Sequence, residues 1–405
     1  MASRLYRFST LTLPLYHNWY DHRTSLSQHL MISCANDNRE EFRVRVNQLP
    51  QTSERKSIRL AKLSPQLSAA SIAKITCDQS SLTTKVECST HGDKPLTRPP
   101  KKAAARLSHL PTEQPNTIAK NLDLKSSLEI ASIINAQDAK VAAAVKPALP
   151  QIARGIDLIA EALQRGGRLI YVGAGTSGRL GALDASECPP TFNTDPKTVQ
   201  FIIAGGIKAL HSATEASEDS RELGRREMAE KKPGKNDVVV GIAASGRTPF
   251  TIAAVEYARS RGAKTIAVAC NADSPLEKAA HFAIVAEVGP EVIAGSSRMK
   301  AGSAQKMILN MLSSGAMTRL GYVYGNLMIN VHVKNYKLRE RGLTILQEAA
   351  GIDREAAEQA LQAAGNDVPI ALVMLQAKVS RLQATKALKS TKGHVREAIN
   401  AARAL

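Results

Sequence analysis

Five short apolar runs, rich in β-branched residues, recur through the middle of the chain and are separated by stretches of helical periodicity. They are RLIYVGA, VQFIIAG, DVVVGIAAS, KTIAVAC and FAIVAEV. Runs of this length without polar alternation are typical of parallel strands that are buried on both faces. The pattern therefore predicts an α/β fold, a doubly wound parallel sheet with helices on both faces.

Two helices are predicted ahead of the first strand. Ser126 and Glu129 have the spacing of a capping box, and isoleucines follow on one helical face. The second helix has apolar residues at spacings of four, three and four, and it ends at Gly166-Gly167. Pro147 and Pro150 are expected to interrupt the first helix and so to separate it from the second.

The pattern divides the 405 residues into three parts. Residues 106–339 contain the five strands and form the predicted sheet domain. Residues 340–405 lack a strand pattern and predict a small helical subdomain of short helices, broken at Gly351, Gly365 and Pro369. Residues 1–105 lack sustained periodicity and end in the linker-like run RPPKKAAA, so a poorly ordered basic extension is the first interpretation.

Two other interpretations of this extension stay open. No methionine lies between Met31 and Met228, so a shorter protein that starts near Leu107 would need a different initiation codon. The extension would then be a gene-start artefact. Alternatively, the absence of acidic residues from the first 20 positions is compatible with an organelle-targeting peptide.

Composition restricts the classes of partner. The net charge of +18 would suit a nucleic acid or a membrane, but basic and acidic residues are mixed and no basic helix is interleaved with aromatics. Five scattered cysteines without C-x-x-C spacing argue against disulfides and zinc and favour a reducing compartment. No apolar run approaches the roughly 20 residues that cross a bilayer. We expect a cytoplasmic protein without a metal, membrane or nucleic-acid partner.

A glycine-rich loop follows the first strand. Gly173, Gly175 and Gly178 form G-x-G-x-x-G, which in a dinucleotide site is joined by an acidic residue at the end of the second strand. Here the second strand ends in Ala204-Gly205, without a carboxylate. The loop therefore favours a smaller phosphate over NAD, and no cofactor is expected.

A related sequence, AASGRTP, follows the third strand, so two Ser-Gly-Arg loops could converge on one phosphate. The alternative is that both are only tight strand-to-helix turns with helix caps. The predicted phosphate-binding residues are Gly175, Thr176, Ser177, Gly178 and Arg179 in the first loop, Ser245, Gly246, Arg247 and Thr248 in the second, and Ser297, Arg298 and Lys300 in the segment SSRMKAGSAQK.

Two carboxylates are the candidates for acid and base chemistry. Glu187 lies one helical turn after Asp184, and Pro189-Pro190 are expected to end the helix and shield Glu187 from water, as a general acid requires. Glu218 lies in TEASEDSRE after the second strand. For Glu218, a catalytic role and a solvated position at a helix start are equally supported by the sequence.

Five motifs together resemble a known family. GAGTSGRLGALDASECPPTF, EDSRE, GIAASGRTPF, SSRMKAG and GNLM are similar to motifs of the N-acetylmuramic acid 6-phosphate etherases, within the SIS superfamily of phosphosugar-binding proteins. The resemblance covers about residues 110–405. It implies hydrolytic loss of D-lactate to give N-acetylglucosamine 6-phosphate in cell-wall sugar recycling, with Glu187 as acid, Glu218 as the second catalytic carboxylate and a homodimer.

Three alternative functions are weighed against this one. A phosphosugar isomerase would use the same fold and base but would release no lactate. A non-catalytic sugar-phosphate sensor would have no reason to keep both carboxylates. An NAD-dependent enzyme is disfavoured by the missing ribose-binding acid.

Overall fold

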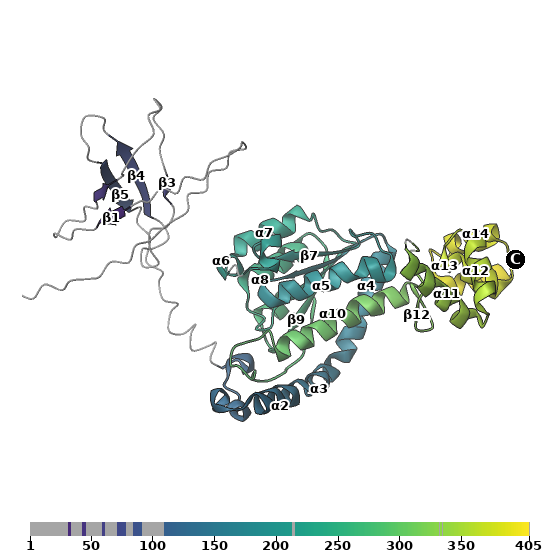
Figure 1. The fold of residues 1–405 in the computed structure, drawn as a ribbon, viewed down its shortest axis with the longest axis horizontal. Coiled ribbons are helices and arrows are strands. Elements are labelled where there is room, and N and C mark those ends of the chain that lie inside the picture. Colours follow the sequence, from purple (N-terminus) through teal and green to yellow (C-terminus); the bar gives the residue numbers. More distant parts are fainter. Residues whose placement is uncertain are drawn as a thin grey trace, which may run out of the picture. The chain divides into compact units, whose positions relative to one another are not determined.

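A computed structural model describes residues 109–212, 215–331, 333 and 335–404, together with five short strands nearer the N-terminus (Figure 1). The chain divides into two units, Met1–Lys101 and Lys102–Leu405, which are described separately. No helix among the described residues is long and apolar enough to cross a membrane.

In the first unit, the strands form two small antiparallel sheets. β1 (Met31–Ser33) pairs with β2 (Arg43–Arg45), and β4 (Ser71–Cys77) lies between β3 (Arg59–Leu60) and β5 (Thr84–Thr90). The sequence pattern predicted no strands here. The predicted poor order of residues 1–105 otherwise falls outside the described residues.

The second unit is built around a five-stranded parallel sheet. Its strands are β6 (Leu169–Gly173), β7 (Val199–Ile203), β8 (Val238–Ile242), β9 (Lys264–Ala269) and β10 (Phe282–Val285), in the order β10-β9-β8-β6-β7. All four pairings are parallel, which confirms the prediction. β6 and β8 are buried along their whole length because both faces of the sheet are covered.

Helices cover the two faces of this sheet (Figure 1). One face packs against α3 (Val141–Val145), α4 (Leu149–Gln164), α5 (Gly175–Phe192) and α10 (Lys300–Arg319), and the other against α7 (Arg221–Glu230), α8 (Pro249–Ser260) and α9 (Pro275–Ala279). Alternate residues of β6 serve the two cores: Tyr171 packs with the first set, and Ile170 and Val172 with the second.

The remaining helices of the sheet domain are short or peripheral. They are α2 (Ser127–Asp138), α6 (Glu215–Glu218) and the 3-10 helices η1 (Pro111–Glu113), η2 (Thr117–Ala119), η3 (Leu122–Leu124), η4 (Lys146–Ala148) and η5 (Ile207–Leu210). The predicted capping box at the start of α2 is confirmed, because Ser126 and Glu129 exchange side-chain-to-backbone hydrogen bonds.

A helical subdomain with its own core follows α10. A hairpin of β11 (Val323–Tyr324) and β12 (Leu327–Met328) leads to α11 (Tyr336–Ala350), α12 (Arg354–Ala363), α13 (Val368–Ala377), α14 (Arg381–Ser390) and α15 (Val395–Arg403). α11 ends at Gly351, as predicted, and Gly351 has the left-handed conformation. The prediction for Pro369 was wrong, because it lies in the first turn of α13, where proline is tolerated.

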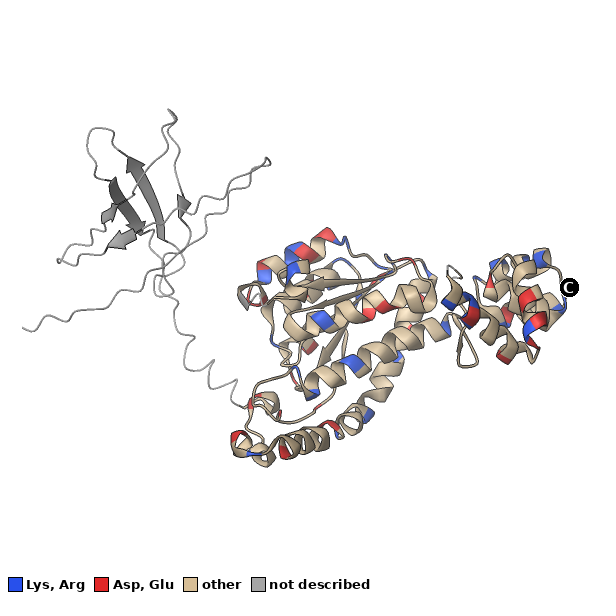
Figure 2. Cartoon of the chain, viewed as in Figure 1, with Lys and Arg blue, Asp and Glu red and all other residues tan. Residues whose placement is uncertain are grey.

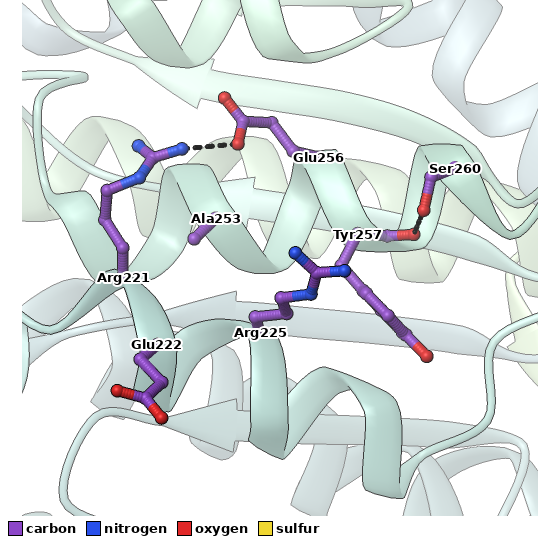
Figure 3. A pocket seen from close by; sticks show the side chains of 7 residues that line it. All are labelled: Arg221, Glu222, Arg225, Ala253, Glu256, Tyr257 and Ser260. Carbon is purple, nitrogen blue, oxygen red and sulfur yellow. Dashed lines mark hydrogen bonds and ion pairs between the residues drawn. The ribbon is translucent and has the colours of Figure 1, made fainter.

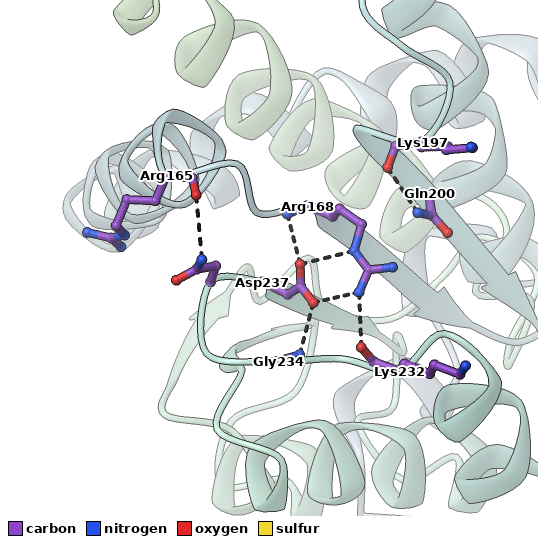
Figure 4. Close-up of polar contacts among 8 residues, drawn as sticks. Arg165, Arg168, Lys197, Gln200, Lys232, Gly234 and Asp237 are labelled. Atoms are coloured by element: carbon purple, nitrogen blue, oxygen red, sulfur yellow. Dashed lines mark hydrogen bonds and ion pairs between the residues drawn. The ribbon is translucent and has the colours of Figure 1, made fainter.

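At the amino-terminal edge of the sheet, an ion pair joins the two central strands (Figure 4). Arg168 precedes β6 and Asp237 precedes β8, and their side chains meet at 2.7 Å with Asp237 almost fully buried. Burial alone would raise the pKa of Asp237, but hydrogen bonds from Arg168 and from the amide of Gly234 bring it below its usual value. This ion pair holds the starts of β6 and β8 together, at the edge of the sheet opposite the glycine loop.

Charged residues of both signs are interspersed over α7 and over the C-terminal helices (Figure 2). α7 itself contains three arginines and three glutamates. This mixing differs from the single-sign stripe that tracks a nucleic-acid backbone.

Candidate active site

The strand order reverses between β6 and β8, which are neighbours in the sheet. The connections that follow these two strands start side by side at the carboxyl edge and then run in opposite directions, which leaves a crevice between them. In open parallel sheets such a reversal creates the crevice in which ligands bind. The two predicted phosphate loops follow these two strands. Topology thus brings both loops to one place.

The first loop joins β6 directly to α5. Gly175 begins the helix with a φ of 51°, in the left-handed region that glycine adopts without strain. The amides of Gly175, Thr176 and Ser177 have no carbonyl one turn earlier to bind, and no side chain caps the helix. These amides and the positive end of the helix dipole suit an anion.

Glu218 is brought to this loop from α6. A Cβ atom on Gly175 would lie 3.1 Å from Glu218 Oε1, so the carboxylate occupies the space beside the glycine. The Glu218 side chain is half-buried. The structure therefore places Glu218 against the phosphate-loop candidates, which sequence spacing could not show.

The second loop lies at the start of α8. The amide of Arg247 donates to Ser245 Oγ at 3.2 Å, and Gly246 has a φ of 65°. Thr248 stands at the N-cap of α8 without a side-chain hydrogen bond to the helix. Arg247 Nε is buried and has no hydrogen-bond partner among the described residues. An anion in the crevice would satisfy such a donor.

Lys300, in the third segment, makes hydrogen bonds within the chain. The Lys300 side chain is buried, and its Nζ donates to the Val288 carbonyl at 2.8 Å and to Gln137 Oε1 at 3.4 Å. Burial lowers the pKa of Lys300, although Glu291 opposes that shift. These internal bonds leave the proposed contact of Lys300 with substrate without support in the single chain.

The start of α10 is capped by a carboxylate that sequence reasoning missed. Glu291 is fully buried, and its two oxygens accept from the amides of Lys300 and Ala301 at 2.9 Å each. The protein's own anion thus satisfies this helix terminus. No sequence signal identifies Glu291, because it lies nine residues before the helix in an irregular segment.

Ser297 and Arg298 differ in exposure. Ser297 is half-buried, and its carbonyl accepts from the amide of Gly302 at 3.0 Å, whereas Arg298 is exposed. A Cβ on Gly302 would lie 3.5 Å from Thr176 Cγ2. The third segment therefore lies against the glycine loop, and its residues remain candidates for contacts with substrate.

The Arg179 side chain makes two hydrogen bonds to backbone carbonyls within the chain. Its Nε donates to the Leu210 carbonyl at 3.1 Å and its Nη2 to the Ser212 carbonyl at 3.2 Å. These bonds fasten the segment after β7, which leads to α6 and Glu218. Arg179 therefore holds this segment to α5, and a direct bond to phosphate remains a prediction.

Glu187 lies farther along α5, and two expectations about it were wrong. The helix continues through Pro189 and Pro190 and ends at Phe192. The two prolines have no N–H to donate to the preceding turn, but the amide of Asn193 donates to the Pro189 carbonyl and closes the last turn. The Glu187 side chain is exposed, so the prolines do not shield it within one chain.

The two candidate carboxylates do not meet within one chain. Glu187 is twelve residues beyond Gly175 on a continuous helix, which corresponds to about 18 Å along the axis. Glu218 lies beside Gly175. A glutamate side chain is too short to bridge that separation.

Asp184, one turn before Glu187, is buried in a polar network. It accepts hydrogen bonds from Tyr171 Oη at 2.7 Å, from Asn310 Nδ2 at 2.6 Å and from Ser313 Oγ at 3.1 Å. Burial raises the pKa of Asp184, and these donors oppose the rise. The network joins β6, α5 and α10 and so fixes the helix that carries Glu187.

A surface groove of about 490 Å³ lies elsewhere, between α7 and α8 (Figure 3). Arg221 pairs with Glu256 at its rim, and the Arg225 guanidinium lies 5.7 Å from the centre of the Tyr257 ring. Neither Glu187, Glu218 nor a predicted phosphate residue lines it. No cluster of three or more potential metal ligands is found in the described part of the chain.

Comparisons with known proteins identify the class. A model of the SIS domain matches residues 230–314, and a model of the glucokinase regulatory protein N-terminal SIS domain matches residues 151–259. A solved phosphoheptose isomerase from Francisella tularensis is 18% identical, covers 48% of this chain and 100% of its own, and has a TM-score of 0.39. The two SIS models match residues that include the five parallel strands, so this domain has a SIS-type α/β fold.

Curated relatives define the family within that class. N-acetylmuramic acid 6-phosphate etherases are 56% identical over 274 residues in Symbiobacterium thermophilum (67% of this chain, 91% of the relative) and 50% over 297 residues in Photorhabdus laumondii (73% and 99%). The relative from Clostridium beijerinckii is 48% identical over 293 residues (72% and 96%). The chain belongs to the N-acetylmuramic acid 6-phosphate etherase family and is an enzyme, a carbon–oxygen lyase.

Proposed function

We propose that the enzyme removes D-lactate from N-acetylmuramic acid 6-phosphate with water and leaves N-acetylglucosamine 6-phosphate, in the recycling of cell-wall amino sugars in the cytoplasm. The observation that carries the proposal is the position of the Glu218 carboxylate beside the open amino terminus of α5. A bound sugar phosphate would place its carbon chain within reach of this carboxylate.

The 6-phosphate is held at the crevice between β6 and β8. Donors available there are the first amides of α5, the hydroxyls of Thr176, Ser245 and Thr248, and the unpaired Nε of Arg247. Hydrogen bonds between charged donors and phosphate oxygens are shorter and stronger than neutral ones. The phosphate thus anchors the substrate while the reacting carbons extend away from the loop.

The chemistry needs a base and an acid. In the opened sugar, the C1 aldehyde acidifies the hydrogen on C2, which Glu218 removes as a proton. A double bond forms between C2 and C3, and the C3–oxygen bond breaks as Glu187 protonates the lactyl oxygen. Water then adds across the double bond, hydroxyl to C3 and hydrogen to C2. Each correctly placed acid or base contributes about 10²–10⁴ in rate.

A second copy of the chain brings the acid to this site. Glu187 is about 18 Å along α5 from the loop and is exposed. Leu183, one turn earlier on the same helix, is a large apolar side chain that is 49% exposed. A homodimer that covers this face of α5 would present Glu187 to the partner's crevice and exclude water from both carboxylates.

Mixing two inactive variants tests the composite site. Glu187→Gln and Glu218→Gln should each lower lactate release by about 10²–10⁴, with the unfolding temperature unchanged. If each site uses one carboxylate from each copy, unfolding and refolding the two variants together restores about a quarter of wild-type activity, because half of the dimers are mixed and each has one intact site. Absence of recovery in dimers shown to be mixed would refute the shared site.

The first experiment distinguishes the alternatives. The full-length protein and a version starting near Leu107 are assayed for lactate from N-acetylmuramic acid 6-phosphate. Lactate from both supports the etherase and makes the extension dispensable. Ligand binding without lactate would indicate a sensor, and conversion of an aldose phosphate to its ketose would indicate an isomerase.

A further inference from the structure

Gln305 of α10 touches the glycine loop from inside the protein. Its side chain is 1% exposed, and its Oε1 accepts a hydrogen bond from Ser177 Oγ at 2.9 Å. Ser177 is the third residue of α5 and supplies one of the open amides at the helix start. Gln305 is therefore bonded to the phosphate-loop candidate from the side away from solvent.

The other end of the Gln305 amide has no partner. Its Nε2 is buried and makes no hydrogen bond within the described residues. A buried N–H without a partner is less well tolerated than an unpaired carbonyl oxygen. Rotation of the amide by 180° exchanges the two atoms within almost the same volume, so Nε2 would then donate to Ser177 Oγ.

The direction of this hydrogen bond decides what Ser177 can offer a ligand. A hydroxyl has one hydrogen, and as arranged it is donated to Gln305. A phosphate dianion only accepts hydrogen bonds. Ser177 can therefore donate to phosphate and keep its hydrogen bond to Gln305 only if Gln305 becomes the donor.

We propose that Gln305 is a positioning residue for phosphate recognition, whose amide turns when a sugar phosphate binds and so releases the Ser177 hydrogen to the phosphate. The inference rests on the proposed binding of a sugar phosphate at the glycine loop and adds a residue that touches no substrate. It makes Gln305 and Ser177 one functional unit.

Gln305→Glu is the sharpest variant. The carboxylate has nearly the same shape, but it only accepts hydrogen bonds, so it retains the Ser177 hydrogen and adds a negative charge near the phosphate. Loss of a hydrogen bond to a charged ligand corresponds to about 10- to 100-fold in affinity. The control is Gln200→Glu in β7. The Gln200 side chain donates to the Lys197 carbonyl near the amino-terminal end of the strand, away from the glycine loop (Figure 4).

Calorimetric binding of N-acetylglucosamine 6-phosphate to the full chain is the measurement, with inorganic phosphate as a competing probe. Gln305→Glu should raise Kd by that factor and Gln200→Glu should leave it unchanged. In turnover, KM rises while kcat stays within about threefold, since the reacting carbons are untouched. Wild-type binding without lactate release would refute the etherase function and leave this inference standing.

A double-mutant cycle separates positioning from packing. Gln305→Met keeps the volume and removes both polar atoms, and Ser177→Ala removes the hydroxyl. If Gln305 acts through Ser177, the double variant binds no more weakly than the weaker single variant. The proposal would be overturned if the losses of affinity in the two single variants multiply in the double variant. Wild-type affinity in a folded Gln305→Glu protein would also overturn it. If Gln305→Glu fails to fold, the methionine cycle decides, and wild-type affinity in Gln305→Met would then also overturn the proposal.

Discussion

The ion pair between Arg168 and Asp237 makes the stability of the sheet depend on one carboxylate. Asp237 accepts four hydrogen bonds: Arg168 gives three, from its amide, Nε and Nη2, and the amide of Gly234 gives the fourth. Asp237→Asn keeps one oxygen and turns the other into an NH₂ group. Two of the four donors, Arg168 Nη2 and the amide of Gly234, then face another donor.

The expected loss follows from these contacts. A hydrogen bond to a charged group contributes about 1.5–3 kcal/mol. The Arg168 side chain is 29% exposed, so water replaces part of what it loses. We therefore expect Asp237→Asn to lower the free energy of unfolding by about 2–4 kcal/mol at pH 7.

The loss also has a defined pH dependence. The pKa of Asp237 is lowered in the folded state, so its contribution is present above the unfolded pKa of about 3.9 and disappears as the pH falls through the folded pKa. The difference between wild type and variant should be constant near neutrality and shrink below about pH 4.

Urea unfolding followed by circular dichroism, at pH 7 and at pH 3, measures both quantities. Glu161→Gln is the control, because its pair with Arg165 is exposed and contributes less than about 1 kcal/mol. A loss below about 1 kcal/mol for Asp237→Asn, or an equal loss at both pH values, would refute the reasoning. Folded Asp237→Asn should release lactate at the wild-type rate, since the Arg168–Asp237 pair lies at the edge of the sheet opposite the glycine loop.

Three further predictions concern packing and reactivity. Gly224→Ala would place a Cβ 2.1 Å from a backbone carbonyl oxygen of α8, so we expect the unfolding midpoint in urea to fall by the equivalent of about 2–4 kcal/mol. Gly175→Ala would strain a φ of 51° and displace Glu218, so lactate release should fall more than about tenfold with a stability loss of only about 1 kcal/mol. Burial raises the pKa of Cys188 and of Cys270 to about 12, so maleimide labelling mapped by mass spectrometry should find both unmodified until the protein is unfolded. Rapid labelling of either in the native protein would contradict this burial.

Local patterns were enough to predict the five strands of the parallel sheet and the fold class. The continuous apolar runs at β6 and β8 indicate strands buried on both faces, and the alternating helices require parallel pairing with crossovers. Helix caps such as Ser126 with Glu129 were also predictable, because they depend on residues three positions apart. The family motifs indicated Glu187 and Glu218 as candidate catalytic carboxylates, but motifs give no distances between residues.

The environments of single side chains depended on contacts between distant segments. Pro189 and Pro190 were expected to end α5, but the helix runs on to Phe192 and leaves Glu187 exposed. Lys300 was a candidate for contact with substrate anions, and its ammonium group donates to the Val288 carbonyl and to Gln137 Oε1.

By itself, the sequence determined the order of the strands and helices of the parallel sheet, since hydrophobic period and capping are properties of neighbouring residues. Only the tertiary structure decided which side chains meet. Gln305 lies against Ser177 and Glu218 against Gly175 because the parallel sheet collects segments far apart in the chain at one edge. The same structure separates Glu187 from Glu218, because a continuous helix holds its residues at a fixed rise.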